Sequence, residues 1–202
     1  MKIICIGRNY AEHAKELNNE VPTSPLIFMK PSTALLTDGK PFYHPVFSSN
    51  IHYELEIVLK ISKNGKAIQQ EFAASYYEEI GLGIDFTARD LQDTLKSKGS
   101  PWELAKAFDH SACVGAFTPK SALDMSALHF QLLKNGHVVQ NGDTSDLIFS
   151  FDYIISYVSK FITLQKGDLI FTGTPAGVGK IEIGDQYIGV LEGNEVLNCS
   201  IK

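Results

Sequence analysis

The sequence has few cysteines, and none of them are paired in a motif. Cys5, Cys113 and Cys199 are the only three among 202 residues, and their spacing excludes a CxxC pair. This usage is typical of reduced, buried thiols and argues against a zinc site built from thiolates. No apolar run reaches the roughly 20 residues that a membrane-spanning helix needs, and residues 3–6 are too short for a signal-peptide core. We therefore expect a cytoplasmic protein without membrane contact.

The sequence also lacks a concentration of positive charge. Its 18 Lys and Arg residues are scattered among 23 Asp and Glu residues, giving a net charge of −5, and Lys96 with Lys98 is the nearest approach to a basic cluster. A nucleic-acid-binding protein gathers such residues on one face. We therefore expect no nucleic-acid partner. The length suits one domain better than two, so we expect a single domain over residues 1–202.

The hydrophobic pattern favours a β-rich α+β domain. Apolar and polar residues alternate over residues 51–60, which predicts a half-buried strand. Asn135-Gly136 stands between two apolar runs and predicts a hairpin with a type I′ turn. Residues 151–162 have apolar positions at helical spacing, and residues 71–79 are also expected to form a helix.

Three acidic residues are candidates for a metal site. Glu54 and Glu56 are two residues apart in the predicted strand, so both point to one face with their Cα atoms roughly 6.5–7 Å apart. Asp85 ends another apolar segment. If the three carboxylates meet, they need a cation, and an all-oxygen set selects magnesium, manganese or calcium. The alternatives are a solvated strand face for the two glutamates and a helix N-cap for Asp85.

Two further features carry ionisable side chains at informative spacing. His13 and Glu16 are three residues apart in a predicted helix, where the carboxylate can hold the imidazole as a general base requires. A surface ion pair is the alternative, and spacing alone favours it. Lys106 stands among apolar neighbours, so it is either buried against an anion or a surface lysine whose stem packs on apolar groups.

The glycine-rich run at residues 172–180 resembles a nucleotide-binding loop only superficially. A P-loop ending at Gly179 and Lys180 would need glycine at position 174 and Ser or Thr at position 181, but these are Thr174 and Ile181. A tight loop remains, whose backbone N–H groups and Thr174 hydroxyl could hold a carboxylate. A plain turn between strands is the alternative, and the run by itself favours that turn.

Taken together, several runs resemble the fumarylacetoacetate hydrolase family, in its order and over nearly the whole chain. They resemble in particular the short members known as acylpyruvases and oxaloacetate decarboxylases. The runs are Gly7-Arg8-Asn9-Tyr10 with His13 and Glu16, Glu54-Leu55-Glu56, Asp85-Phe86-Thr87-Ala88-Arg89-Asp90, Lys98 to Trp102 with Ala105-Lys106, Gln140-Asn141-Gly142, Gly167-Asp168, and Thr172 to Gly179.

The resemblance assigns roles to individual residues. It implies a metal held by Glu54, Glu56 and Asp85, while His52 matches no ligand. It implies that His13 and Glu16 form a water-activating pair on a possible lid over residues 11–24. It also implies that Lys106 is an active-site lysine. Positions near a bound keto acid match Arg8, Lys30, Gln92 and Thr174. The implied fold is a β-rich roll of mixed sheets with a few peripheral helices, usually a homodimer.

The resemblance also implies an enzyme that uses Mg²⁺ or Mn²⁺, with Ca²⁺ possible, and no organic cofactor. Its substrate would be a small keto acid. We rank first the hydrolysis of the C–C bond of a 2,4-diketo acid to pyruvate, because the His13–Glu16 pair can activate water. Alternatives are oxaloacetate decarboxylation or tautomerisation and isomerisation of 2-hydroxyhepta-2,4-diene-1,7-dioate. A hypothesis of another class is a non-catalytic module that binds calcium for structure.

Overall fold

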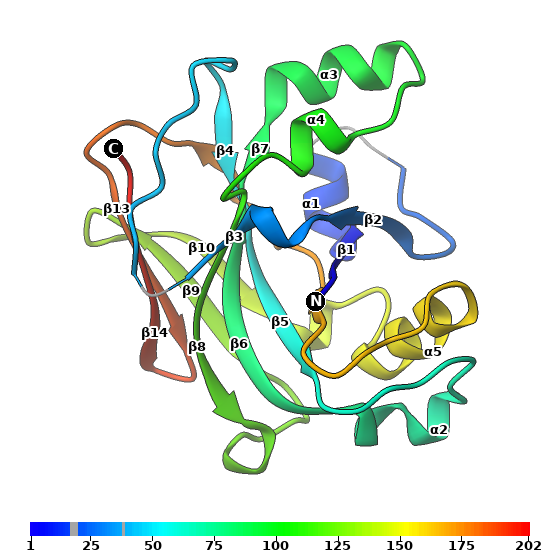
Figure 1. Cartoon of the computed structure of the whole chain (residues 1–202). Helices are drawn as coiled ribbons and strands as arrows, with labels where there is room; N and C mark the ends of the chain where they lie inside the picture. The colour runs from blue at the N-terminus through cyan, green and yellow to red at the C-terminus, as the bar shows by residue number, and fades with distance from the viewer. Residues whose placement is uncertain (17–19, 38) are drawn as a thin grey trace.

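A computed structural model of the chain describes residues 1–16, 20–37 and 39–202. Its largest sheet has seven strands in the order β2-β1-β11-β5-β6-β8-β3 (Figure 1). In that order the strands are Leu26–Lys30, Ile3–Gly7, Leu169–Phe171, Leu55–Ile61, Tyr77–Asp85, Ala112–Pro119 and Leu35–Leu36. β1 pairs with β11 and β3 with β8 in parallel, and the other neighbours are antiparallel. The predicted strand-rich fold of mixed sheets is thus confirmed.

Two smaller sheets complete the strands of the described residues. One has the order β10-β9-β13-β14 and the other β12-β4-β7. Their strands are, in these orders, His137–Asp143, His129–Lys134, Gln186–Leu191, Asn194–Ser200, and then Gly179–Lys180, Ile51–Tyr53, Thr87–Ala88. The predicted hairpin is confirmed at β9 and β10, where Asn135 and Gly136 both have positive φ, of 52° and 84°.

The helices are short and peripheral, as expected. Helices α3 and α4 lie at one end of the large sheet, and α2 and α5 lie at the other (Figure 1). The α-helices are α1 Ala11–Glu16, α2 Gln70–Ala73, α3 Arg89–Ser97, α4 Glu103–Lys106 and α5 Phe151–Phe161, and the 3-10 turns are η1 Ser32–Ala34, η2 Ala74–Tyr76, η3 Lys120–Ala122 and η4 Thr144–Asp146. The Ser150 hydroxyl caps α5 by accepting from the Tyr153 N–H.

The helix expected over residues 71–79 is wrong. One turn of α2 and the 3-10 turn η2 are followed by β6, which begins at Tyr77. Tyr77 is buried and its ring meets Phe151 edge-on at 6.3 Å, while Glu78 and Glu79 lie outside the core. Pairing of Tyr77 with Ile61 in the neighbouring strand supplies hydrogen bonds and burial that local helical propensity cannot match.

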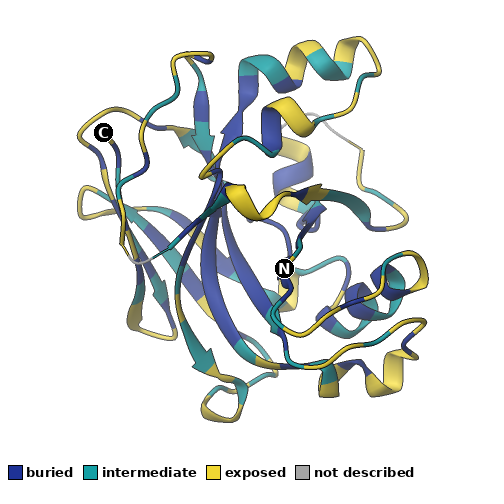
Figure 2. Cartoon of the chain, in the orientation of Figure 1, coloured by how far each residue is buried: buried dark blue, intermediate teal, exposed yellow. Residues whose placement is uncertain are grey.

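The prediction of a single half-buried strand over residues 51–60 is also wrong, because the segment is divided and is more deeply buried than expected. The segment is split into β4 and β5 on either side of Glu54, and β5 is buried on both faces. The central strands β5 and β6 are dark blue over most of their length in the burial colouring, and exposed residues gather on helix surfaces and loops (Figure 2). Glu54 and Glu56 therefore lie inside the protein, and the solvated-face alternative is excluded for both.

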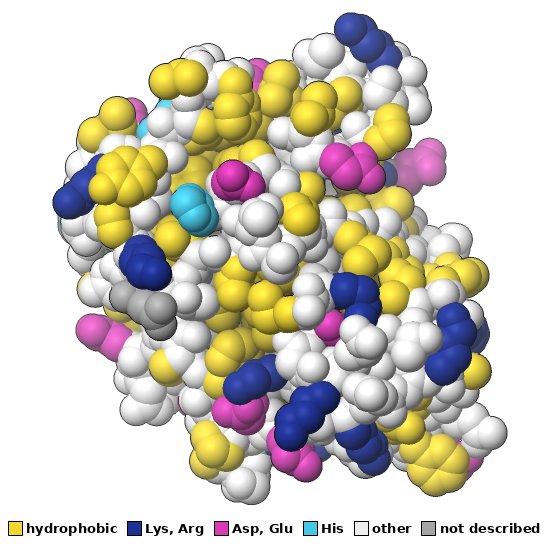
Figure 3. Space-filling view, viewed as in Figure 1, with side chains coloured by type: hydrophobic (Ala, Val, Ile, Leu, Met, Phe, Trp, Pro, Cys, Tyr) yellow, Lys and Arg dark blue, Asp and Glu magenta, His cyan; other side chains and the backbone are white. Residues whose placement is uncertain are grey.

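The surface exposes both apolar and charged side chains (Figure 3). No helix among the described residues is long and apolar enough to cross a membrane. In the space-filling view, apolar side chains gather on the upper part of the visible face, and basic side chains are interspersed with acidic ones lower down (Figure 3). Exposed apolar residues include Phe47 and Leu104, which line a shallow groove of about 490 Å³. All three cysteines are buried free thiols, as predicted.

Candidate active site

Strand pairing brings the three predicted metal ligands together. Glu56 is the second residue of β5 and Glu54 immediately precedes that strand, and the Asp85 N–H at the end of β6 donates to the Glu54 carbonyl at 2.8 Å. One carboxylate oxygen from each residue lies within 4.8 Å of the others, and all three side chains are buried. The N-cap alternative for Asp85 is excluded, since α3 begins at Arg89 and Ala88 precedes it.

Lys106 is held in the middle of this cluster. Its Nζ donates to Glu54 at 2.7 Å, to Asp85 at 2.8 Å and to the Thr87 hydroxyl at 2.6 Å, so its three protons are all in use. Burial disfavours the ammonium, but Asp85 and Glu54 outweigh burial and raise the pKa of Lys106. The surface-lysine alternative is wrong, because only 3% of Lys106 is exposed.

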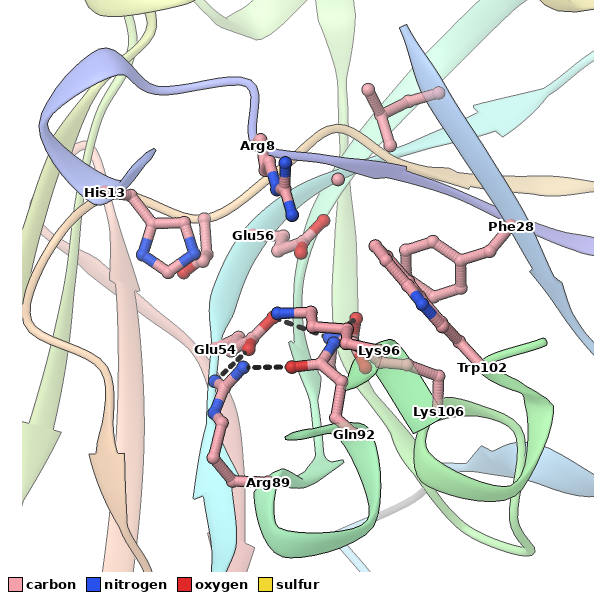
Figure 4. Close-up of a pocket in the computed structure, with 14 residues that line it drawn as sticks. Arg8, His13, Phe28, Glu54, Glu56, Arg89, Gln92, Lys96, Trp102 and Lys106 are labelled. Atoms are coloured by element: carbon pink, nitrogen blue, oxygen red, sulfur yellow. Dashed lines mark hydrogen bonds and ion pairs between the residues drawn. The ribbon is translucent and has the colours of Figure 1, made fainter. Parts of the chain in front are cut away.

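Two other cations form ion pairs with Asp85 and Glu54. Lys30 Nζ lies 2.7 Å from Asp85 Oδ1, and Arg89 Nη2 lies 2.5 Å from Glu54 Oε1. Burial acts against the Glu54 carboxylate, but Lys106 and Arg89 prevail and lower its pKa. Arg89 also donates to Gln92 at 2.6 Å, as the dashed lines in Figure 4 indicate.

Glu56 differs because none of these cations forms an ion pair with it. The Gly173 N–H donates to Glu56 Oε2 at 2.7 Å, but burial and the nearby carboxylates of Asp85 and Glu54 raise its pKa well above the usual range. A divalent cation among the three carboxylates would relieve this repulsion. The donor set therefore fits a hard cation that prefers oxygen ligands.

His13 and Glu16 form the predicted pair on α1. His13 Nδ1 lies 3.2 Å from Glu16 Oε2, and only 5% of His13 is exposed, so the surface-ion-pair alternative is wrong. Burial lowers the pKa of His13, and the neighbouring Glu54 and Glu16 offset burial only in part. The imidazole is therefore neutral at pH 7. In that state Nδ1–H can donate to Glu16, which leaves Nε2 as a base.

The glycine-rich loop supports both the metal cluster and the histidine. Besides the Gly173 N–H on Glu56, the Gly177 N–H donates to Glu16 Oε1 at 3.1 Å. Thr174 Oγ1 accepts from Gln140 Nε2 at 2.9 Å, so the Thr174 hydroxyl proton is free to point elsewhere. The loop is thus more than a plain turn, since its N–H groups bind two carboxylates of the protein itself.

A pocket of about 30 Å³ joins these elements (Figure 4). Of the predicted substrate-binding residues, Arg8, Gln92 and Thr174 line it, whereas Lys30 lies behind Asp85 and does not. Residues for which we predicted no role also line it: Phe28, Arg89, Lys96 and Trp102. Arg89 and Trp102 belong to the family-like runs, and Trp102 is the single tryptophan, so both carried a sequence signal.

The possible lid over residues 11–24 is described only in part. Residues 17–19 lie outside the described residues. Helix α1 places His13 at the pocket, and Glu16 accepts a hydrogen bond from the glycine-rich loop. That this segment is mobile without ligand and closes over the site when a ligand binds stays a prediction.

Comparisons with known proteins agree with this site. The family model described as fumarylacetoacetate (FAA) hydrolase C-terminal matches residues 2–202. The mitochondrial oxaloacetate tautomerase of Mus musculus is 46% identical over 201 residues, covering 99% of this chain and 91% of that protein. An oxaloacetate tautomerase of Escherichia coli is 36% identical over 197 residues, with coverage of 96% and 90%.

Solved structures of other enzymes also match the fold over nearly the whole chain. The crystal structure of fumarylpyruvate hydrolase from Pseudomonas aeruginosa in complex with Mn²⁺ and pyruvate superposes with a TM-score of 0.94 at 36% identity, covering 100% of this chain and 89% of that one. A structure of 2-hydroxyhepta-2,4-diene-1,7-dioate isomerase from Mycobacterium marinum has a TM-score of 0.85 at 34% identity, covering 99% and 73%. On the strength of its sequence, fold and buried carboxylate cluster, the chain belongs to the fumarylacetoacetate hydrolase family and is an enzyme.

Proposed function

We propose that the protein interconverts the enol and keto forms of oxaloacetate. The observation that carries this proposal is His13, a neutral, buried imidazole fixed by Glu16 at the edge of a carboxylate cluster. Tautomerisation needs one group that removes or returns a proton at C3, and it needs no attacking water. Relatives named as oxaloacetate tautomerases, 45–46% identical over nearly the whole chain, support this ranking over hydrolysis.

A Mg²⁺ or Mn²⁺ ion held by Glu54, Glu56 and Asp85 would supply Lewis acidity toward the carboxylate and 2-keto oxygens of the substrate. The chain's own residues supply the rest. His13 Nε2 accepts the proton from C3 of the keto form, and the resulting imidazolium gives that proton to the 2-oxygen of the enolate. In the reverse direction neutral His13 takes the proton from the enol 2-OH and delivers it to C3. The Thr174 hydroxyl, oriented by Gln140, donates to a substrate carboxylate.

Lys106 does not donate a hydrogen bond directly to the substrate in this proposal. Its three N–H groups contact protein oxygens, so its contribution is a fixed positive charge that spaces the carboxylates of Glu54 and Asp85 and stabilises negative charge on the 2-oxygen of the substrate. Arg89 donates both to Glu54 and to Gln92, and so adds a second fixed positive charge beside the Glu54 carboxylate.

The test follows the decay of enol absorbance of oxaloacetate with Mg²⁺ and after chelation. We expect chelation to abolish catalysis. His13→Ala should lower the rate by about 10²–10⁴-fold, the usual cost of losing a general base. Its affinity for Mn²⁺ should stay near that of the original protein. An unchanged rate in either experiment contradicts the proposal.

Hydrolysis of an acylpyruvate is the second candidate. The fumarylpyruvate hydrolase of P. aeruginosa supports it, and the same His13–Glu16 pair could deprotonate water for attack on the 4-carbonyl. Pyruvate release from a panel of acylpyruvates, measured beside oxaloacetate tautomerisation and decarboxylation, ranks the activities. A protein that releases pyruvate faster than it tautomerises oxaloacetate reverses our order.

Assembly and location complete the proposal. We keep a homodimer and a cytoplasmic location as predictions. Sedimentation of the pure protein tests the first, because a dimer has about twice the 22.3 kDa mass of the chain. Fluorescence microscopy of the tagged protein in its own cells tests the second.

A further inference from the structure

The pocket carries more positive charge than its own carboxylates require. Around the cluster, Glu54, Glu56 and Asp85 are matched in number by three cations, Lys30, Lys106 and Arg89. Two more cationic side chains line the same pocket, Arg8 and Lys96. Neither forms an ion pair with any acidic side chain in the described part of the chain. A metal ion would add further positive charge, so the complete site suits a ligand with more than one negative charge.

Lys96 is held at a defined place in this pocket. Arg89, Gln92 and Lys96 stand at positions i, i+3 and i+7 of α3 and so share one face of the helix, and all three line the pocket. The Lys96 ammonium lies 5.6 Å from the centre of the Trp102 ring, within cation–π range. Trp102 in turn packs against Phe28 at 6.2 Å.

Lys96 is also poorly neutralised. Burial lowers its pKa, as do the nearby charges of Arg89, Arg8 and Lys106, while Asp93 acts in the other direction. In Figure 4 Arg8 enters the pocket from the β1 side and Lys96 from the α3 side. An anionic group on a ligand between them would gain a charge-assisted hydrogen bond and relieve the repulsion among the cations.

We propose that Lys96 is a specificity-determining residue that binds a second carboxylate of the substrate, at the end remote from the 2-keto acid group. The enzyme would then select 2-keto dicarboxylates over monocarboxylates of the same length. The Trp102 ring lies beside the Lys96 ammonium and favours this direction of the side chain. The inference rests on the proposed function in one respect only, that the 2-keto carboxylate lies at the metal end.

The experiment compares two five-carbon ligands, 2-oxoglutarate and 2-oxopentanoate, which share the keto acid end and differ in the distal carboxylate. Trp102 is the single tryptophan and lines the pocket, so its fluorescence reports binding without turnover. Calorimetry repeats each titration. With Mg²⁺ present, we expect the diacid to bind about 10- to 100-fold more tightly, as a hydrogen bond between charged groups allows.

The variants separate charge from packing. Lys96→Met removes the charge but keeps an unbranched side chain, and should remove the preference by weakening diacid binding, with a much smaller effect on 2-oxopentanoate. Lys96→Arg should retain most of the preference. Lys98→Met is the matched control, because Lys98 is exposed on the same segment and does not line the pocket.

Several outcomes overturn the proposal. The proposal fails if the original protein does not prefer the diacid, or if the preference survives in Lys96→Met. It also fails if Lys96→Met weakens the binding of both ligands equally. A preference that is lost in Arg8→Met but kept in Lys96→Met would assign the distal carboxylate to Arg8 instead. Failure of the proposed function gives another pattern, in which oxaloacetate tautomerisation is absent while the Lys96-dependent preference for the diacid persists.

Discussion

Replacing Lys106 with methionine should destabilise the metal-free protein and make its stability depend on metal. The substitution removes one ammonium and leaves an apolar stem of similar length. It also removes the donor of three hydrogen bonds of 2.6–2.8 Å, to Glu54, Asp85 and Thr87. All of these groups are buried. Removing one partner of a buried ion pair costs about 3–5 kcal/mol of unfolding free energy, because the remaining charges stay buried without compensation.

A divalent cation should reverse much of that loss. Lys106 is the cation that bridges Glu54 and Asp85 in this structure, so removing it leaves a more negative cluster for a metal to neutralise. We expect Lys106→Met to bind Mn²⁺ at least as tightly as the original protein. Saturation at about 1,000 times the dissociation constant adds about 4 kcal/mol of stability, comparable with the loss.

The assay is urea unfolding of both proteins with a chelator and with Mn²⁺, followed by far-UV circular dichroism. Lys98→Met serves as the exposed control and should change stability by less than about 0.5 kcal/mol. Enzyme activity should fall in Lys106→Met even where Mn²⁺ restores stability, because the fixed charge near the reacting oxygen is lost. Equal stability of variant and original protein in chelator, or a loss that Mn²⁺ does not reduce, refutes the reasoning.

Four further outcomes are expected. Burial lowers the pKa of His13, so activity should persist as pH falls through about 6.5 and decline only at lower pH. The unfolded chain takes up this proton at a higher pH than the folded protein, so His13 also makes the free energy of unfolding decrease as pH falls below about 6.5. An acidic decline of activity centred above pH 7 contradicts the assignment of His13 as the base. Gly177→Ala should cost about 1–3 kcal/mol in thermal unfolding and reduce activity, since a Cβ there lies 2.4 Å from a backbone carbonyl at a φ of +97°, whereas Gly136→Ala, with nothing within 4 Å, should cost less. Glu56→Ala should weaken Mn²⁺ binding severely in a calorimetric titration, and affinity like that of the original protein removes Glu56 from the ligand set. Hydrogen exchange over residues 11–24 should slow when oxalate and Mg²⁺ are added, and equal protection in both states argues against a closing lid.

The sequence by itself determined the local features of this protein. The two-residue period of a strand places Glu54 and Glu56 on one face, and the three-residue spacing on a helix places Glu16 beside His13. Asn135-Gly136 specified its hairpin through backbone conformation alone. Each of these depends on residues a few positions apart, so short-range geometry suffices. The run of family-like motifs then identified the family, which no single spacing could do.

Only the tertiary structure decided the environment of the site. The antiparallel register of β5 and β6 brings Asp85 beside Glu54, and burial of the sheet on both faces encloses two glutamates that alternation alone assigned to solvent. Lys30 and Lys106 are 76 residues apart, yet both contact Asp85. The electrostatic potential and the burial at Asp85 depend on side chains from segments that are far apart in the sequence. For that reason only the folded structure shows that Lys106 uses all three of its protons in hydrogen bonds, that several pKa values are shifted, and that Lys96 forms no ion pair among the described residues.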